Sequence, residues 1–160
     1  LKGPFGSGAD LRGSTVGIHG CGHIGKEVVK LLQPFGVNIL ACDRVDISAF
    51  CKQWNVQSVG PEELWSRSDV LTIHLPRNGS TIGLYPPEVL SKQKPGNVLV
   101  NWTRVGIGHE VALDHGLQYG DIATAAVYAV ANETPPGPPT PALSTVLSHQ
   151  PTTPPPTATC

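Results

Sequence analysis

The sequence has no methionine, few charged residues and no long apolar run. Charged side chains make up 14% of 160 residues and the formal net charge is −1, so no basic surface for nucleic acid is expected. Apolar segments such as residues 98–100 are strand-sized, which excludes a membrane span, and no secretory signal is visible. Because a complete reading frame would begin with methionine, we expect a piece of a longer protein.

The four cysteines form no C-x-x-C pair. We therefore expect free thiols in a reducing, cytoplasmic compartment. His19, Cys21 and His23 are spaced two apart, as metal ligands can be, but they lie on a glycine turn where a metal would occupy the space of a phosphate. No metal is expected.

The most informative stretch is residues 15–43, which predicts a strand, a glycine turn, a helix and a second strand. Thr15–His19 is the first expected strand, and residues 20–25 form a Gly-x-Gly-x-x-Gly turn. Residues 26–35 carry apolar side chains at helical spacing, and residues 37–42 form another apolar run that ends at Asp43.

Each part of this unit has a role in binding a dinucleotide. Gly20 allows a tight turn, Gly22 lets a diphosphate approach the backbone, and Gly25 lets helix and strand pack closely. The helix N-terminus faces the phosphates, and Asp43 stands where a carboxylate accepts hydrogen bonds from a ribose. Asp43 favours NAD over NADP, a preference that Arg44 softens. The alternative is a glycine turn in an ordinary α/β core with a surface aspartate.

Strands and helices continue to alternate along the chain. Further strands are expected at residues 56–59, at an edge of the sheet, at 70–75, at Asn97–Asn101, fully buried, and at 122–130. Helices are expected at residues 46–55, from Pro61, at 86–93 and at 110–119. This alternation predicts a doubly wound, Rossmann-like α/β fold whose parallel sheet binds its ligand at the carboxyl ends of the strands.

Composition suggests three segments. Residues 1–12 form a glycine-rich approach, and residues 13–133 form the dinucleotide-binding domain. Residues 134–160 contain nine prolines and no charged side chain, so we expect an extended or disordered tail in which only residues 143–147 dock.

Several phrases, in order, resemble the NAD-binding domain of the D-isomer-specific 2-hydroxyacid dehydrogenases. They are Asp10-Leu11-Arg12-Gly13, the glycine turn through Lys26, Ser68-Asp69-Val70, His74-Leu75-Pro76 with Thr81, Lys94-Pro95-Gly96, Leu99-Val100-Asn101 with Arg104, and Glu110 with Ala112-Leu113. The resemblance covers residues 9–136.

The resemblance implies hydride transfer between a small 2-hydroxy acid and NAD to give a 2-oxo acid, in a homodimer whose substrate domain is largely absent here. Carried over by position, Arg104 grips the substrate carboxylate, Glu133 orients a histidine, and His149 is the candidate for that histidine. The residues it implies for the cofactor are Gly20, Gly22, His23, Ile24, Gly25, Asp43, Arg44, His74, Leu75, Pro76, Thr81, Trp102, Thr103 and Tyr128.

Some positions depart from the family pattern. Val105 replaces a glycine, Trp102 and Thr103 replace small residues, and Tyr128 replaces an aspartate. These departures leave open a catalytically impaired dinucleotide-sensing or scaffolding module. A methyltransferase-type domain that binds S-adenosylmethionine also places an acid after its second strand, but it leaves the phrases around His74 and Arg104 unexplained.

Overall fold

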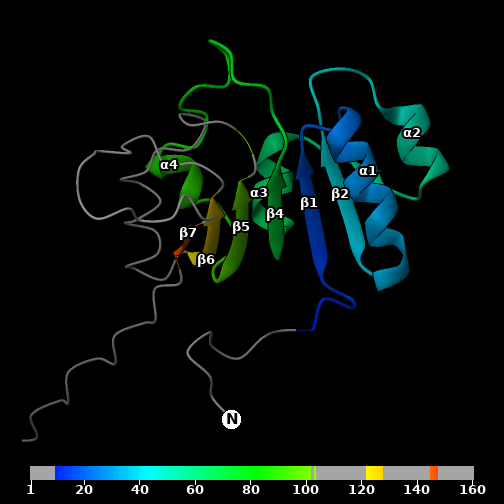
Figure 1. The fold of residues 1–160 in the computed structure, drawn as a ribbon, viewed down its shortest axis with the longest axis horizontal. Coiled ribbons are helices and arrows are strands. Elements are labelled where there is room, and N and C mark those ends of the chain that lie inside the picture. Colours follow the sequence, from blue (N-terminus) through cyan, green and yellow to red (C-terminus); the bar gives the residue numbers. More distant parts are fainter. Residues whose placement is uncertain (1–9, 102, 104–121, 128–144, 148–160) are drawn as a thin grey trace, which may run out of the picture.

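The computed structural model describes residues 10–101, 103, 122–127 and 145–147, which form one sheet with flanking helices (Figure 1). The seven strands lie in the order β3-β2-β1-β4-β5-β6-β7. They are Thr15–His19 (β1), Asn38–Cys42 (β2), Gln57–Ser58 (β3), Val70–Ile73 (β4), Asn97–Asn101 (β5), Ile122–Val127 (β6) and Thr145–Leu147 (β7). β1 to β6 pair in parallel, and β7 pairs antiparallel with β6. This is the doubly wound fold that the alternation predicts.

The helices are His23–Leu32 (α1), Ser48–Gln53 (α2), Pro61–Arg67 (α3) and Pro87–Leu90 (α4), and a 3₁₀ turn, Gln33–Phe35 (η1), extends α1. α3 and α4 each begin with proline followed by acids, which suits the free N–H groups and positive dipole of a helix start. At the far end of α1 and η1, Gly36 has a φ of 65°, a left-handed conformation that favours glycine.

Side chains of the central strands alternate between two cores, one on each face of the sheet. Val16 and Ile18 of β1 pack toward α1 and α2, together with Ile39 and Ala41 of β2. The next residues along β2, Leu40 and Cys42, pack on the opposite face with α3 and α4. Burial on both faces explains why these strands have no polar alternation.

Several predicted boundaries are wrong by a few residues. α1 begins at His23 rather than at residue 26, because the glycine turn leads directly into the helix. β4 ends at Ile73, so His74 and Leu75 lie in the loop that follows. The helix predicted at 86–93 is the single turn α4.

The remaining predictions about the elements have mixed outcomes. The predicted edge position of the strand near residue 57 is confirmed by β3. Val98 and Val100 of β5 are half-buried, so this strand is not fully buried as predicted. β7 lies within the tail segment that was expected to dock, whereas the helix predicted at 110–119 lies outside the described residues.

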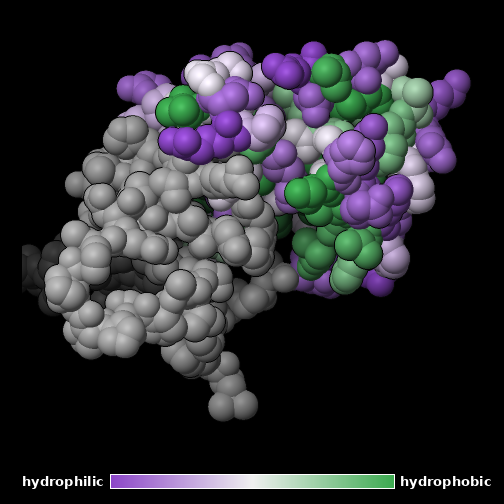
Figure 2. Space-filling model, turned by 45° about the horizontal axis from the view of Figure 1, so that its top comes forward, coloured by the Kyte–Doolittle hydropathy of each residue, from purple (hydrophilic) through white to green (hydrophobic). Residues whose placement is uncertain are grey.

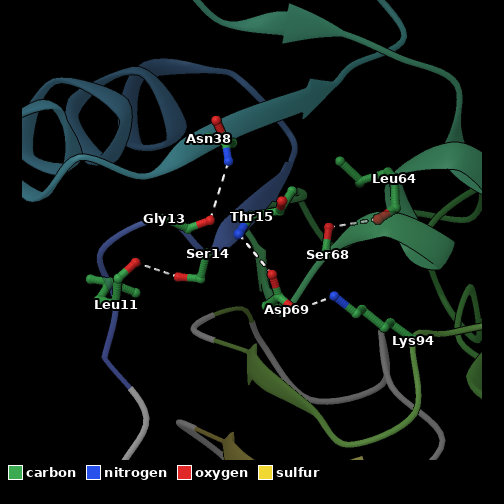
Figure 3. A network of polar contacts seen from close by, with 9 residues as sticks. All are labelled: Leu11, Gly13, Ser14, Thr15, Asn38, Leu64, Ser68, Asp69 and Lys94. Atoms are coloured by element: carbon green, nitrogen blue, oxygen red, sulfur yellow. Dashed lines mark hydrogen bonds and ion pairs between the residues drawn. The ribbon is translucent and has the colours of Figure 1, made fainter.

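A network of polar contacts lies at the amino edge of the sheet, the side on which the parallel strands begin (Figure 3). The Thr15 N–H donates to Asp69 Oδ2 at 2.8 Å, and Lys94 Nζ donates to Asp69 Oδ1 at 2.5 Å. Nearby, the Asn38 amide donates to the Gly13 carbonyl at 3.3 Å. These bonds satisfy the first backbone groups of β1 and tie it to the start of β4 and to the loop before β5.

Three cysteines, Cys21, Cys42 and Cys51, are buried free thiols, as predicted for them. Burial raises the pKa of each, to about 11 for Cys21.

On the face shown in Figure 2, apolar areas alternate with polar ones. Among the described residues, no helix is long and apolar enough to cross a membrane.

Candidate functional site

A cavity of about 540 Å³ lies at the carboxyl ends of β1, β2, β3 and β4. Its volume falls within the range of small-molecule sites, roughly 300–1,000 Å³. It is lined by His19, Gly20, Gly22, Cys42, Asp43, Arg44, Val45, Val59, Gly60, Pro61, His74, Leu75, Pro76, Asn78, Ser80, Thr81 and Leu84. The cavity therefore lies where a doubly wound sheet is expected to bind its ligand.

The three glycines of the turn differ in their surroundings. Gly20 has a φ of +95°, and a Cβ there would lie 2.8 Å from the His74 carbonyl group. A Cβ on Gly25 would lie 2.2 Å from the Gly20 carbonyl oxygen, so the helix packs directly on the turn. A Cβ on Gly22 would meet no atom within 4 Å. Gly20 and Gly25 serve the packing of the protein, whereas Gly22 borders open space in the cavity.

Asp43 points toward the glycine turn. Its Oδ2 accepts a hydrogen bond from the Cys21 N–H at 2.7 Å, and its Oδ1 accepts one from the Val45 N–H at 3.2 Å. An ionised carboxylate can accept about four hydrogen bonds, so these two leave it able to bind ligand hydroxyl groups as well. The backbone thus fixes a half-buried acid at the wall of the cavity.

The N-terminus of α1 opens on the same side. Its N-cap is Gly22, no side chain caps it, and no acid occupies its first turn. The first N–H groups of a helix have no partner within the helix and carry a partial positive charge. This end of α1 is suited to an anionic group such as a diphosphate.

The loop after β4 forms the facing wall. His74 is half-buried, its Nε2 lies 3.0 Å from Thr72 Oγ1, and burial lowers its pKa. The Thr81 hydroxyl donates to the Pro76 carbonyl and accepts from the Asn78 N–H at 2.9 Å. These contacts hold the loop in a fixed shape over the cavity.

His19, the last residue of β1, lies at the floor of the cavity and is only 6% exposed. Its Nδ1 is hydrogen-bonded to the Tyr85 hydroxyl, and the two rings pack edge to face. Burial lowers the pKa of His19 to about 4, against the opposing effect of the Asp43 charge. The ring is therefore neutral near pH 7.

The structure brings eight of the residues predicted for the cofactor together in the lining. They are Gly20, Gly22, Asp43, Arg44, His74, Leu75, Pro76 and Thr81. His23, Ile24 and Gly25 form the first turn of α1 without lining the cavity, and Thr103 is buried beside Asn101, which accepts its N–H at 3.0 Å. Trp102, Arg104, Tyr128, Glu133 and His149 lie outside the described residues.

Other lining residues are absent from the prediction. Val59, Gly60 and Pro61 follow β3, and Asn78, Ser80 and Leu84 extend the loop after β4. The rule that ligands lie beyond the carboxyl ends of parallel strands points to both loops. His19 is the last residue of its strand, so the same rule points to it, but in the sequence it stands out only as one of three spaced candidates for metal ligands.

Comparisons with known proteins agree with this geometry. The sequence model of the D-isomer specific 2-hydroxyacid dehydrogenase NAD binding domain matches residues 2–154. The D-3-phosphoglycerate dehydrogenase of Archaeoglobus fulgidus is 38% identical over 136 residues, which are 85% of this chain and 26% of that protein. That of Mycobacterium leprae is 35% identical over 127 residues, 79% of this chain and 24% of that protein. The chain thus spans about a quarter of the length of these curated relatives.

Solved structures give the same result for the fold. The pyruvate reductase of Chlamydomonas reinhardtii matches with a TM-score of 0.75 and 30% identity, over 79% of this chain and 37% of that one. A D-lactate dehydrogenase from Sporolactobacillus matches with a TM-score of 0.74 and 35% identity, over 79% of this chain and 38% of that one. The fold and the family predicted from the sequence are both confirmed: this chain belongs to the D-isomer-specific 2-hydroxyacid dehydrogenases, as their NAD-binding domain.

Proposed function

We propose that this chain binds NAD for an oxidoreductase that transfers a hydride between a small 2-hydroxy acid and NAD, giving a 2-oxo acid. One observation carries the proposal: a carboxylate, Asp43, is hydrogen-bonded to the glycine turn beside an open position at Gly22, in a cavity of ligand size. This combination suits a ribose next to a diphosphate.

The residues present fit the cofactor. The first N–H groups of α1 and the open backbone at Gly22 would hold the diphosphate, and Asp43 would accept hydrogen bonds from the ribose hydroxyls. When bound, NAD supplies the nicotinamide that exchanges a hydride with the substrate. Apolar lining residues such as Val59 and Leu84 would exclude water around the adenosine.

The chemical roles follow the family resemblance. Arg104 would bind the substrate carboxylate through its planar guanidinium, and His149 would take the hydroxyl proton as a base with Glu133 orienting it. Trp102, Thr103 and Tyr128 would lie near the nicotinamide. A substrate domain would come from a longer protein, and we infer a cytoplasmic homodimer, for which the buried free thiols support the reducing compartment.

Ligand titration tests the cofactor. NAD is expected to bind with a Kd below about 1 mM and more tightly than NADP, because the Asp43 charge repels a 2′-phosphate. Asp43→Ala should weaken NAD binding by about tenfold or more, since hydrogen bonds to a charged group are strong. Asp46→Ala is the matched control, because Asp46 is an exposed acid three residues away whose carboxylate bonds the Ser48 N–H. Absence of NAD binding at millimolar concentration would refute the proposal.

Turnover is tested separately. A panel of 2-hydroxy acids with NAD, followed at the NADH absorbance, distinguishes a dehydrogenase from a module that only binds the cofactor. Arg104→Lys should lower kcat/KM, because a point charge replaces a two-pronged carboxylate grip. Equal activity of Arg104→Lys and the unchanged protein would remove Arg104 from the site.

A further inference from the structure

The contact between His19 and Tyr85 has a consequence for the ligand. Both side chains belong to the core on the α3 face, where Tyr85 is 1% exposed, yet His19 also lines the cavity. An imidazole in this position has one ring nitrogen engaged by the protein and a second that is available. Which nitrogen carries the proton decides what the cavity offers to a ligand.

The position of the proton follows from hydrogen-bond accounting. The Tyr85 hydroxyl has a single proton and is hydrogen-bonded to His19 Nδ1, and the neighbouring Trp65 side chain acts on the same hydroxyl as a hydrogen-bond donor. If Nδ1–H donated to Tyr85, the hydroxyl proton would be left buried without an acceptor, which is unfavourable. Trp65, which packs edge-on to Tyr85 at 6.1 Å, offers only a donor from its side chain. Tyr85 therefore donates to Nδ1, and the proton of the neutral imidazole is on Nε2.

His19 Nε2 is the ring nitrogen that Tyr85 does not engage. No described residue forms a hydrogen bond with it. Since His19 contributes to the cavity lining, the Nε2–H is the ring donor left for that space.

We propose that His19 Nε2–H donates a hydrogen bond to the adenosine diphosphate half of the bound dinucleotide, and that Tyr85 is the positioning residue that fixes this tautomer. The inference rests on the proposed binding of NAD. It adds a contact that neither the glycine turn nor Asp43 provides. A donor on this floor favours an acceptor atom, such as a phosphate or ribose oxygen or an adenine ring nitrogen.

The choice of the adenosine diphosphate half follows from the cavity walls. Gly20 and Asp43, which border His19, would hold diphosphate and ribose, and Val59 and Gly60 continue the wall beyond β2. The pKa of His19, lowered to about 4 by burial despite Asp43, keeps it a neutral donor. Burial also raises the pKa of Tyr85, so the phenol keeps the proton that it donates.

Nitrogen NMR on the unmodified chain tests the tautomer directly. With histidine labelled with ¹⁵N, a long-range proton–nitrogen spectrum at pH 7 should show His19 as the Nε2–H form, and ADP-ribose should shift the Nε2 signal. The His19→Leu spectrum assigns the signal among the six histidines. A predominant Nδ1–H form, or an Nε2 signal that saturating ADP-ribose leaves in place, would overturn the proposal.

Two variants test the contribution to affinity. His19→Leu should raise the Kd for both NAD and ADP-ribose by about fivefold, which corresponds to one neutral hydrogen bond. Tyr85→Phe keeps the ring and removes the hydroxyl, so the Kd should rise by about threefold and the Nδ1–H form should appear in the spectrum. Ile122→Val is the control, because Ile122 lies in the same core without lining the cavity: its melting temperature should fall while the Kd is unchanged.

The outcomes separate this inference from the proposed function. If the unmodified chain binds neither NAD nor ADP-ribose, the proposed function fails and this contact fails with it. If it binds both and neither His19→Leu nor Tyr85→Phe changes the Kd, only the role of His19 is refuted. A loss seen with NAD but not with ADP-ribose would refute the assignment to the adenosine diphosphate half.

Discussion

The polar groups at the beginnings of the strands (the amino edge) and at their ends (the carboxyl edge) are satisfied in different ways. At the amino edge, Asp69 accepts hydrogen bonds from Thr15 and Lys94, so protein groups satisfy one another (Figure 3). At the carboxyl edge, the N-terminus of α1 has no side-chain cap, Gly22 faces open space and His19 lines the cavity. The amino edge is complete without a ligand, whereas the carboxyl edge retains hydrogen-bonding capacity for one.

Folding stability and NAD binding are therefore expected to depend on different ends of the sheet. Changes at the amino edge should lower the free energy of unfolding without changing the Kd for NAD, and changes at the carboxyl edge should do the reverse. Gly25 is the expected exception, because it lies at the binding edge but is enclosed by protein atoms.

Gly25→Ala should have the largest effect, and it should lower both the folding stability and the affinity for NAD. The new Cβ would lie 2.2 Å from the Gly20 carbonyl oxygen, a backbone atom, so α1 must shift away from the turn. We expect a loss of about 3 kcal/mol in unfolding free energy and a melting temperature lower by roughly 10 °C. NAD binding should weaken as well, because the N-terminus of α1 moves. Urea unfolding and ligand titration measure the two effects, and a wild-type melting temperature would contradict the packing.

Gly22→Ala should affect NAD binding much more than folding stability. No atom lies within 4 Å of the new methyl group, so the unfolding free energy should fall by no more than about 1 kcal/mol, the cost of alanine at a helix N-cap. The methyl group would enter the space proposed for the diphosphate, and the Kd for NAD should rise by about tenfold or more. Calorimetric titration beside a thermal melt checks both quantities. An unchanged Kd would show that the diphosphate does not approach Gly22.

Asp69→Asn should produce the smallest effect, confined to stability. At pH 7 we expect a loss of about 1 kcal/mol, reduced by the partial exposure of the Asp69–Lys94 pair, with the Kd for NAD unchanged. Hydrogen bonds from Lys94 and from the Thr15 N–H hold the pKa of Asp69 below its ordinary value. Its stabilising contribution is therefore complete above the unfolded pKa of about 4 and is lost as the pH falls through the folded pKa.

Urea unfolding between pH 7 and pH 2 should show the Asp69→Asn variant converging with the unchanged chain at the acid end. Lys94→Met is the control, because it removes the ion pair and keeps the Thr15 bond; it should cost about 0.5 kcal/mol. A constant difference between Asp69→Asn and the unchanged chain down to pH 2 would contradict the shifted pKa.

Local patterns predict a large part of this molecule. The predicted bounds of β1 and β5 agree with the structure to the residue, and the glycine spacing locates the turn and its acid. Where prediction fails, the cause lies in tertiary structure. α4 is a single turn, and the Lys94 N–H beyond it bonds to the Trp65 carbonyl of α3 instead of continuing the helix.

The His19–Tyr85 contact was not predictable for a different reason. The two residues are 66 positions apart, and nothing in the sequence around either one indicates the other as its partner. Their partnership appears only when β1 and the segment before α4 meet on one face of the sheet. Local sequence periodicity does not predict a contact between side chains so far apart in the chain.

The buried thiols offer a way to follow motion in each half of the molecule. Cys21 and Cys51 lie in the core beneath α1 and α2, whereas Cys42 lies in the core beneath α3. A thiol reagent reaches a buried sulfur only when its surroundings open, so its reaction rate measures how often that layer opens. The chain thus carries a built-in reporter in each layer, and bound cofactor should slow the reaction at Cys42 in the cavity wall.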